Sequence, residues 1–206
     1  MRRFLPALIA MLVVTAVSGF VPIAEGRDHL NGDYAFTTFR ACTVANNPFI
    51  IDPSGASTII PAGPIVRQNT VDSGIITFNP DGTGVSVGRS ETMNISATGG
   101  SILGINEFTT PFTYTIDGDD TIIFHFDTAT FASILGSGAG NTGTLEPRTG
   151  RAQIGKGANT IVSGPAAQIE QEVVHINMVN DGTIIQYRLC VRSSLNARMR
   201  VDRDDD

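Results

Sequence analysis

The side chains best suited to acid–base chemistry in this sequence of 206 residues are its histidines and a few carboxylates. Histidine exchanges a proton near neutral pH, and a nearby carboxylate can assist it. His125 and His175 alternate with apolar neighbours, so each belongs to a polar row opposite an apolar row. If the polar rows lined an enclosed space, His125, Asp127 and His175 could meet there. We favour the alternative that both histidines face solvent, because alternation does not fix which row is inside.

Other polar patterns give weaker indications of chemistry. Glu107, Glu170 and Glu172 lie in or beside predicted strands, where paired carboxylates could hydrolyse a glycosidic bond or simply protect strand edges. Segment 150–157 nearly matches a phosphate-binding loop, but Gly157 stands where a magnesium-binding hydroxyl is needed. No serine lies in a Gly-x-Ser-x-Gly motif. We therefore expect no cofactor and no metal, and enzymatic activity is an alternative to binding.

These residues would be positioned by β-strands, because apolar and polar side chains alternate with a period of two over most of the chain. A first strand is expected over 34–44. Three hairpins are predicted from alternating runs joined by Asp-Gly turns at 79–82, 117–120 and 180–182. Segments 46–64 and 133–167, rich in turn-forming residues, are expected to be long connections, with one short extended stretch at 160–162. The sequence predicts an all-β fold of about eight antiparallel strands.

The N-terminal segment 1–26 has the layout of a cleavable secretory signal. Arg2 and Arg3 precede an apolar run over 5–17, and small residues follow up to Gly26. The apolar run is shorter than the roughly 20 residues that a membrane-spanning helix needs. We expect a single domain over 27–197 in the periplasm or outside the cell, with no membrane span after cleavage. A charged, disordered tail is expected over 198–206.

The two cysteines indicate how the strands close. An exported chain can keep a disulfide, and a bridge between Cys42 and Cys190 would make the first and last predicted strands neighbours. An up-and-down β-barrel brings those strands together where its sheet seals. A β-sandwich could also bring them together, so it is the alternative fold.

The charge of the mature chain argues against polyanionic partners. The formal charge is −6, and removal of Arg2, Arg3 and Glu25 takes away a net +1, which leaves −7. Lys156 is the only lysine, and the arginines are scattered along the sequence. Without a basic face, the chain is not expected to bind nucleic acid.

The start of the domain resembles the lipocalin and wider calycin families. Asn31-Gly-Asp-Tyr34 leads into a strand as their Gly-x-Trp motif does, with Tyr34 in place of the tryptophan. In those families an arginine on the last strand packs across the aromatic ring, and Arg188 or Arg192 would take that part. The chain also resembles small exported bacterial proteins of unknown function that end in Cys-x-Arg-Ser, here 190–193. The resemblance implies a calyx-like barrel and, by analogy, a small apolar ligand.

We therefore expect a binding protein whose inward aromatic side chains line a cavity for one small, mainly apolar molecule. The candidate lining residues are Phe36, Phe112, Tyr114, Phe124 and Tyr187. The same rings could instead fill the barrel. Two other functions stay open: a barrel cyclase, isomerase or hydrolase that uses His125, His175 or a strand carboxylate, and a cell-envelope interaction protein without a pocket.

Overall fold

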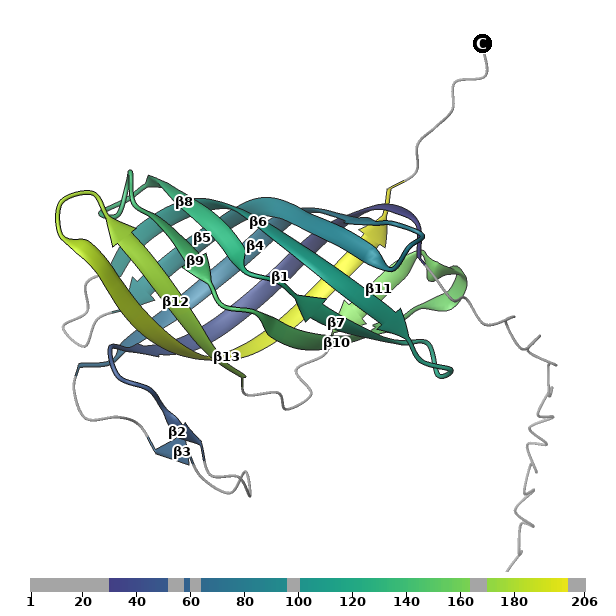
Figure 1. The fold of residues 1–206 in the computed structure, drawn as a ribbon, viewed down its shortest axis with the longest axis horizontal. Helices are drawn as coiled ribbons and strands as arrows, with labels where there is room; N and C mark the ends of the chain where they lie inside the picture. The colour runs from purple at the N-terminus through teal and green to yellow at the C-terminus, as the bar shows by residue number, and fades with distance from the viewer. Residues whose placement is uncertain (1–29, 52–57, 60–63, 96–100, 164–169, 200–206) are drawn as a thin grey trace, which may run out of the picture.

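The computed structural model describes residues 30–51, 58–59, 64–95, 101–163 and 170–199. The predicted signal segment 1–26 and residues 200–206 of the predicted tail lie outside these ranges. The chain forms an elongated barrel of inclined strands (Figure 1). Among the described residues, no helix has the length and apolar character needed to cross a bilayer.

Thirteen strands and one short 3-10 helix make up the described part of the chain. The strands of the barrel wall are β1 (Gly32–Ala45), β4 (Val66–Phe78), β5 (Thr83–Ile95), β6 (Ser101–Ile116), β7 (Thr121–Phe126), β8 (Ala129–Leu135), β9 (Thr142–Leu145), β10 (Arg148–Ile154), β11 (Thr160–Ser163), β12 (Glu170–Met178) and β13 (Gly182–Arg198). The 3-10 helix η1 (Lys156–Ala158) precedes β11. A separate hairpin, β2 (Ile50–Ile51) with β3 (Thr58–Ile59), projects from the side of the barrel (Figure 1).

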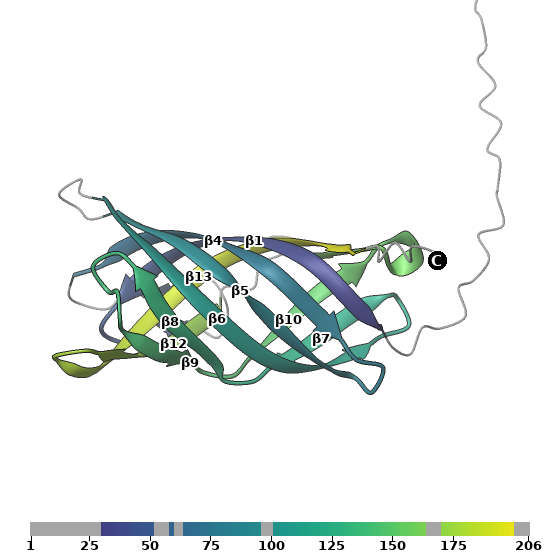
Figure 2. The same ribbon diagram turned by 90° about the horizontal axis from the view of Figure 1, so that it is seen from above.

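The wall strands form a closed, antiparallel ring. The order β1-β4-β5-β6-β7-β10-β11-β13 returns to β1, because β1 also pairs with β13 along its length. A second ring runs through β8, β9 and β12 in place of β7, β10 and β11, because β6 also pairs with β8. The two sets of short strands lie at opposite ends of the barrel (Figures 1 and 2). The predicted all-β, antiparallel fold with eight strand positions is confirmed.

The three predicted hairpins are confirmed. The sequence 79–82 joins β4 to β5, and Gly82 adopts φ +81°, which glycine tolerates because it has no Cβ. The backbone N–H of Asn79 donates to the carbonyl of Thr83 at 2.9 Å, which closes this turn. The turns at 117–120 and 180–182 join β6 to β7 and β12 to β13. Local turn signals therefore define most of the strand order.

Two segments that were predicted to be long connections contain β-strands. Segment 46–64 contains the β2–β3 hairpin, and segment 133–167 contains β9 and β10 besides the end of β8, while β11 matches the short extended stretch expected at 160–162. Glycine hides the strand pattern because it contributes no side chain to it. At Gly143 an added Cβ would lie 2.4 Å from the ring of Phe131, so the glycine leaves room for that ring against the backbone. β13 ends at Arg198, the first residue of the predicted tail.

Aromatic side chains fill the interior at one end of the barrel. The buried rings of Tyr34, Phe78, Phe112, Tyr114 and Phe124 form one cluster at the end of the barrel that β7, β10 and β11 complete. The centroids of neighbouring rings lie 5.1–6.2 Å apart, mostly in the edge-to-face arrangement that is favoured by the electrostatic quadrupoles of aromatic rings. These contacts close one end of the barrel.

The chain segment before β1 adds a plug to this end. The Tyr114 hydroxyl donates to the Leu30 carbonyl at 2.8 Å and accepts from its N–H at 2.9 Å. Leu30 is only 2% exposed. The plug is therefore held by both packing and hydrogen bonds.

The outer wall is unusually apolar on one side. Phe39 of β1 pairs with Val71 of β4, and Val191 and Leu195 of β13 lie beside them on the same outer face. These four side chains are 42–54% exposed. They form an outer apolar strip across three neighbouring strands.

Candidate ligand-binding site

The lumen contains a cavity of about 510 Å³. Its apolar part is lined by Phe36, Phe108, Phe124 and Phe126, which come from β1, β6 and β7. Its polar part is lined by Asp72, Glu172, Arg148 and Arg192, together with hydroxyl groups of neighbouring strands. A cavity of this size and mixed lining suits one small organic molecule.

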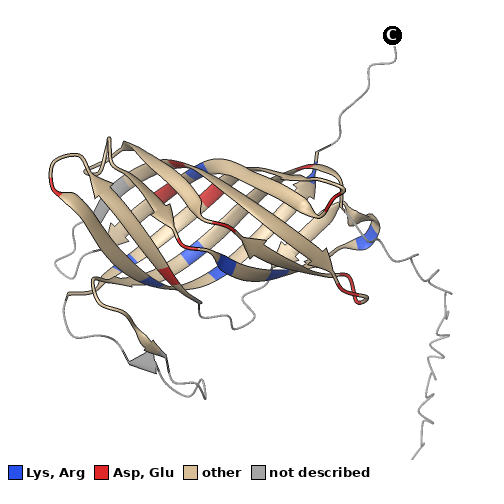
Figure 3. Ribbon diagram, viewed as in Figure 1, with Lys and Arg blue, Asp and Glu red and all other residues tan. Residues whose placement is uncertain are grey.

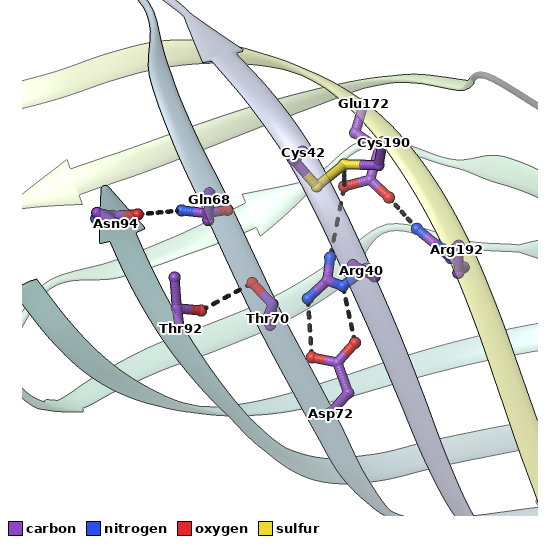
Figure 4. The surroundings of a disulfide bond; sticks show 10 residues. All are labelled: Arg40, Cys42, Gln68, Thr70, Asp72, Thr92, Asn94, Glu172, Cys190 and Arg192. Carbon is purple, nitrogen blue, oxygen red and sulfur yellow. Dashed lines mark hydrogen bonds and ion pairs between the residues drawn. A yellow bond between two sulfur atoms is a disulfide. The ribbon is translucent and has the colours of Figure 1, made fainter. Parts of the chain in front are cut away.

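A network of ionic contacts crosses the lumen beside this cavity. Arg40 of β1 uses Nε and Nη2 to bind the two carboxylate oxygens of Asp72 on β4, each at 2.8 Å. Its Nη1 lies 3.5 Å from Oε2 of Glu172 on β12. Ser90 donates to Asp72 at 2.5 Å, and Arg192 of β13 donates to Glu172. The two acidic groups are thus bound by arginines of neighbouring wall strands (Figure 4), and acidic and basic residues are both present on the strands of the wall (Figure 3).

Burial and charge set the ionisation of this network. Burial alone would raise the pKa of Glu172, but the combined attraction of Arg192, Arg40, Arg148 and Arg188 lowers that pKa to about 2. Burial alone would lower the pKa of Arg40, yet Asp72 and Glu172 raise it above its ordinary value. Glu172 and Arg40 are therefore charged across the whole physiological pH range.

A smaller cavity of about 90 Å³ adjoins the larger one. Asp72, Phe108, Thr110, Arg148 and Arg192 line both cavities, so the two compartments share a boundary. The small compartment is also lined by Arg40, Arg188 and the polar residues Ser90, Thr92 and Asn106. The lumen therefore has an aromatic compartment and a compact cationic compartment.

Arg188 is an incompletely compensated cation of this compartment. Its Nε is buried and has no hydrogen-bond partner. Burial and repulsion from Arg40 lower the pKa of Arg188 to about 10, against the attraction of Glu172 and Asp72. The guanidinium stays protonated at neutral pH. The folded protein therefore contains a buried positive charge, which is unfavourable for the free energy of folding.

The disulfide lies at the edge of the charged compartment. Cys42 of β1 and Cys190 of β13 are directly opposed in the register and bonded, as predicted. Oε2 of Glu172 lies 3.8 Å from Sγ of Cys190, and Arg40 approaches the same carboxylate (Figure 4). The covalent link therefore fixes β1 and β13 where they supply Arg40, Arg188 and Arg192.

The large cavity extends into the wall between β10 and β13. Both faces of these strands line it, with Arg151 and Val191 from the outer face and Arg148 and Arg192 from the inner face. β11 ends at Ser163 and β12 begins at 170, so among the described residues no strand pairs with the facing edges of 148–152 and 191–193. We call this gap the side opening.

The structure brings some of the predicted aromatic lining residues together. Phe36 and Phe124 line the large cavity, whereas Phe112 and Tyr114 are buried in the aromatic cluster that closes the end of the barrel. Tyr187 was predicted wrongly. Its neighbour Arg188 lines the small cavity, so by strand alternation the Tyr187 side chain belongs to the outer row of β13.

The alternative polar site does not form in the lumen. His125 and Asp127 are exposed, and His175 lies on the outer row of β12, where its Nε2 is 2.9 Å from Oε1 of Glu146. Because His125 lies on β7 and His175 on β12, they belong to opposite ends of the barrel. The outward direction of both rows follows from the burial of Phe124 and Val174 beside them.

The predicted carboxylates and arginines also lie in different parts of the structure. Glu107 is exposed and pairs with Arg89 at 3.0 Å, while Glu172 is inside, and the side chain of residue 170 lies outside the described part of the structure. Arg198, not Arg188 or Arg192, is the β13 residue opposite Tyr34. Arg188 and Arg192 instead line the cationic compartment.

Sequence reasoning missed the charged lumen. Arg40 lies on the same alternating row as Tyr34, Phe36 and Cys42, so the row with the aromatic side chains already contained a charge. Asp72 likewise shares its row with Ile76. A charged residue on an otherwise apolar row was the available signal.

No protein-family model matches this chain, and no curated protein matches it either.

Proposed function

We propose that this chain is an exported binding protein that holds one small, mainly apolar molecule inside its barrel. The observation that carries the proposal is the cavity of about 510 Å³ between the aromatic cluster and the ionic network. Ligand sites of roughly 300–1,000 Å³ are typical for small organic molecules.

The arrangement of the lining supports a bound molecule over a barrel filled by its own side chains. The rings of Phe112, Tyr114 and Phe78 pack against one another, whereas Phe36 and Phe108 approach each other at 6.2 Å and border open volume. The apolar part of a ligand would pack against Phe36 and Phe108, which border the open volume. This would recover dispersion and hydrophobic energy that the empty cavity lacks.

Export is part of the proposal. The leader-like segment 1–26 supports it at the sequence level. The Cys42–Cys190 bond supports it as well, because disulfides persist mainly in oxidising compartments such as the periplasm and the extracellular space.

Catalysis is less well supported by the same geometry. A barrel cyclase, isomerase or hydrolase would need a group that exchanges protons near neutral pH. Glu172 has its pKa lowered to about 2, and it is bound by Arg192. His125 and His175 lie on the outer wall, so the lumen offers ligand-holding groups in preference to acid–base groups.

A cell-envelope interaction protein is the second candidate. The outer apolar strip formed by Phe39, Val71, Val191 and Leu195 supports it, because exposed apolar patches often mark interaction sites. It would not require an occupied lumen. The occupancy of the barrel therefore discriminates between the two candidates.

Native mass spectrometry of the protein purified from the periplasm tests the proposal. We expect a stoichiometric added mass that is released on denaturation and can then be identified. Ser86 lines the large cavity and is 8% exposed, so Ser86→Leu should fill the space and remove the added mass. Ser73→Leu on the outer face of β4 is the matched control and should retain it. A ligand-free mass together with no uptake of added apolar compounds would reject the proposal in favour of the surface role.

A further inference from the structure

The described lumen carries more positive than negative charge. Its acidic groups are Asp72 and Glu172. Its cations are Arg40, Arg148, Arg188 and Arg192. Counted over the described side chains, four positive charges against two negative charges leave an excess of +2 in the lumen of a protein whose formal net charge is −6. An enclosed charge excess of this kind disfavours the empty state unless a counter-charge enters.

The acidic groups are already satisfied within the barrel. Asp72 accepts hydrogen bonds from Arg40 and Ser90, and Glu172 is bound by Arg192 and approached by Arg40. Among the side chains that the structure describes, these contacts leave no lumen carboxylate free for a cationic ligand. The excess charge therefore resides on the arginines that border the small compartment.

The excess is located where a ligand group can reach it. Arg148 and Arg192 line both compartments, and the Arg188 guanidinium lines the small one with a buried Nε that lacks a hydrogen-bond partner. The guanidinium carbon of Arg148 lies 4.8 Å from the centroid of the Phe126 ring. Arg148 therefore stands at the junction between the aromatic and cationic compartments.

We propose, on the basis of the proposed binding function, that the ligand is an amphipathic organic anion. Its acidic group, a carboxylate or a group of similar size, occupies the compartment of about 90 Å³ beside Arg188, Arg148 and Arg192. Its apolar body lies in the larger cavity against Phe36, Phe108 and Phe124. Arginine suits this role because its planar fork of donors matches a carboxylate.

The position of the side opening is consistent with this orientation. Arg151 lines the large cavity from the outer face of β10, and Arg148 lines it from the inner face of the same strand. An anion that enters between β10 and β13 therefore meets one arginine outside and others inside. The acidic group would pass to the small compartment, and the apolar body would follow into the aromatic one.

The test compares three compounds with the same ten-carbon body: decanoate, decanol and decylamine. Binding to the purified, oxidised protein is measured by isothermal titration calorimetry at neutral pH. We expect decanoate to bind at least tenfold more tightly than decanol, and decylamine to bind more weakly than either. If decanol or decylamine binds as well as decanoate, the anion inference is wrong while the binding function stands. If none of the three binds, both proposals fail.

A pair of variants locates the acidic group. Arg188→Gln should reduce the preference for decanoate over decanol by about tenfold and leave decanol binding unchanged. Arg89→Gln, which removes an exposed arginine paired with Glu107 on the outer wall, should leave the preference intact. An unchanged preference in Arg188→Gln would overturn the assigned location. The comparison of compounds on the unmodified protein does not depend on the folding of any variant.

Discussion

Cys42 and Cys190 face each other directly across the β1–β13 pairing, with their Cα atoms 4.1 Å apart. The bond joins the first wall strand to the last over a sequence separation of 148 residues, and it does so at the seam that turns a sheet into a ring. In its absence, β1 and β13 would be held only by their backbone ladder and by side chains such as Arg40.

Removal of this bond should weaken the fold strongly. The double substitution Cys42→Ala and Cys190→Ala should lower the free energy of unfolding by about 5 kcal/mol, because the crosslink restricts a long loop in the unfolded chain. Urea unfolding at neutral pH measures the loss. Reduction of the unmodified protein should give a loss of similar size. A loss below about 1 kcal/mol would show that the backbone ladder alone seals the ring.

Two arginines on β13 should affect stability in opposite directions. Arg188→Met should raise the free energy of unfolding of the ligand-free protein by about 1–3 kcal/mol, because it removes a buried charge with an unpartnered Nε. Arg192→Met should lower it by about 3–5 kcal/mol, because it removes the donor to Glu172 and leaves that carboxylate less compensated. Chemical unfolding of both variants under the same conditions measures the contrast. Destabilisation of equal size by both substitutions would contradict it.

The free energy of unfolding should decrease at acidic pH because Glu172 becomes protonated. Its pKa is about 2 in the folded protein and has an ordinary value of 4.5. A lowered folded pKa gives stability that is present above about pH 4.5 and is lost as the pH falls towards 2. The difference corresponds to about 3 kcal/mol.

Glu172→Gln should therefore be less stable at neutral pH and should show a flatter dependence of the unfolding free energy between pH 4.5 and 2. Glu107→Gln is the control, because Glu107 is exposed on the outer wall and should leave the acid dependence unchanged. Urea unfolding across this range measures both slopes. Identical slopes for Glu172→Gln and the unmodified protein would rule out Glu172 as the source.

The Tyr114 hydroxyl should hold the plugged end closed. Its single proton is shared between the carbonyl oxygens of Leu30, at 2.8 Å, and Asn79, at 2.9 Å, and its oxygen accepts from the N–H of Leu30. Tyr114→Phe should cost about 1–3 kcal/mol, because it leaves buried backbone groups without partners. Hydrogen exchange at the Leu30 amide should become faster. Tyr187→Phe removes the same hydroxyl from the outer face and should change neither quantity.

The antiparallel order was predictable because its signals are local. The turn at 79–82 combines Asn, Pro, Asp and Gly between alternating runs, and such a turn defines a hairpin without knowledge of distant contacts. The Cys42–Cys190 pairing was predictable from export chemistry and from the places of the two cysteines near the ends of the domain. β9 and β10 were missed because Gly143 and Gly150 replace side chains that would have continued the alternation.

The binding site was only partly predictable, since each lumen contact depends on which row faces inward. Phe36 and Phe124 were found because aromatic residues on a strand favour the interior. Tyr187 failed the same argument because its row faces outward. Arg40, Asp72 and Glu172 come from β1, β4 and β12, so their contacts arise only when the ring closes.

The wall is interrupted at neighbouring places on three successive strand positions. β7 gives way to β8 after Phe126, β9 to β10 around Pro147, and β11 ends before β12 begins. Pro111 of β6 faces the first break, where its carbonyl accepts from the N–H of Asp127 but its ring nitrogen has no hydrogen to donate. The long strands β1, β4, β5, β6 and β13 thus act as a common spine that carries two short arcs. Because each arc closes its own ring on that spine, the two ends of the barrel are separate rings that share five strands.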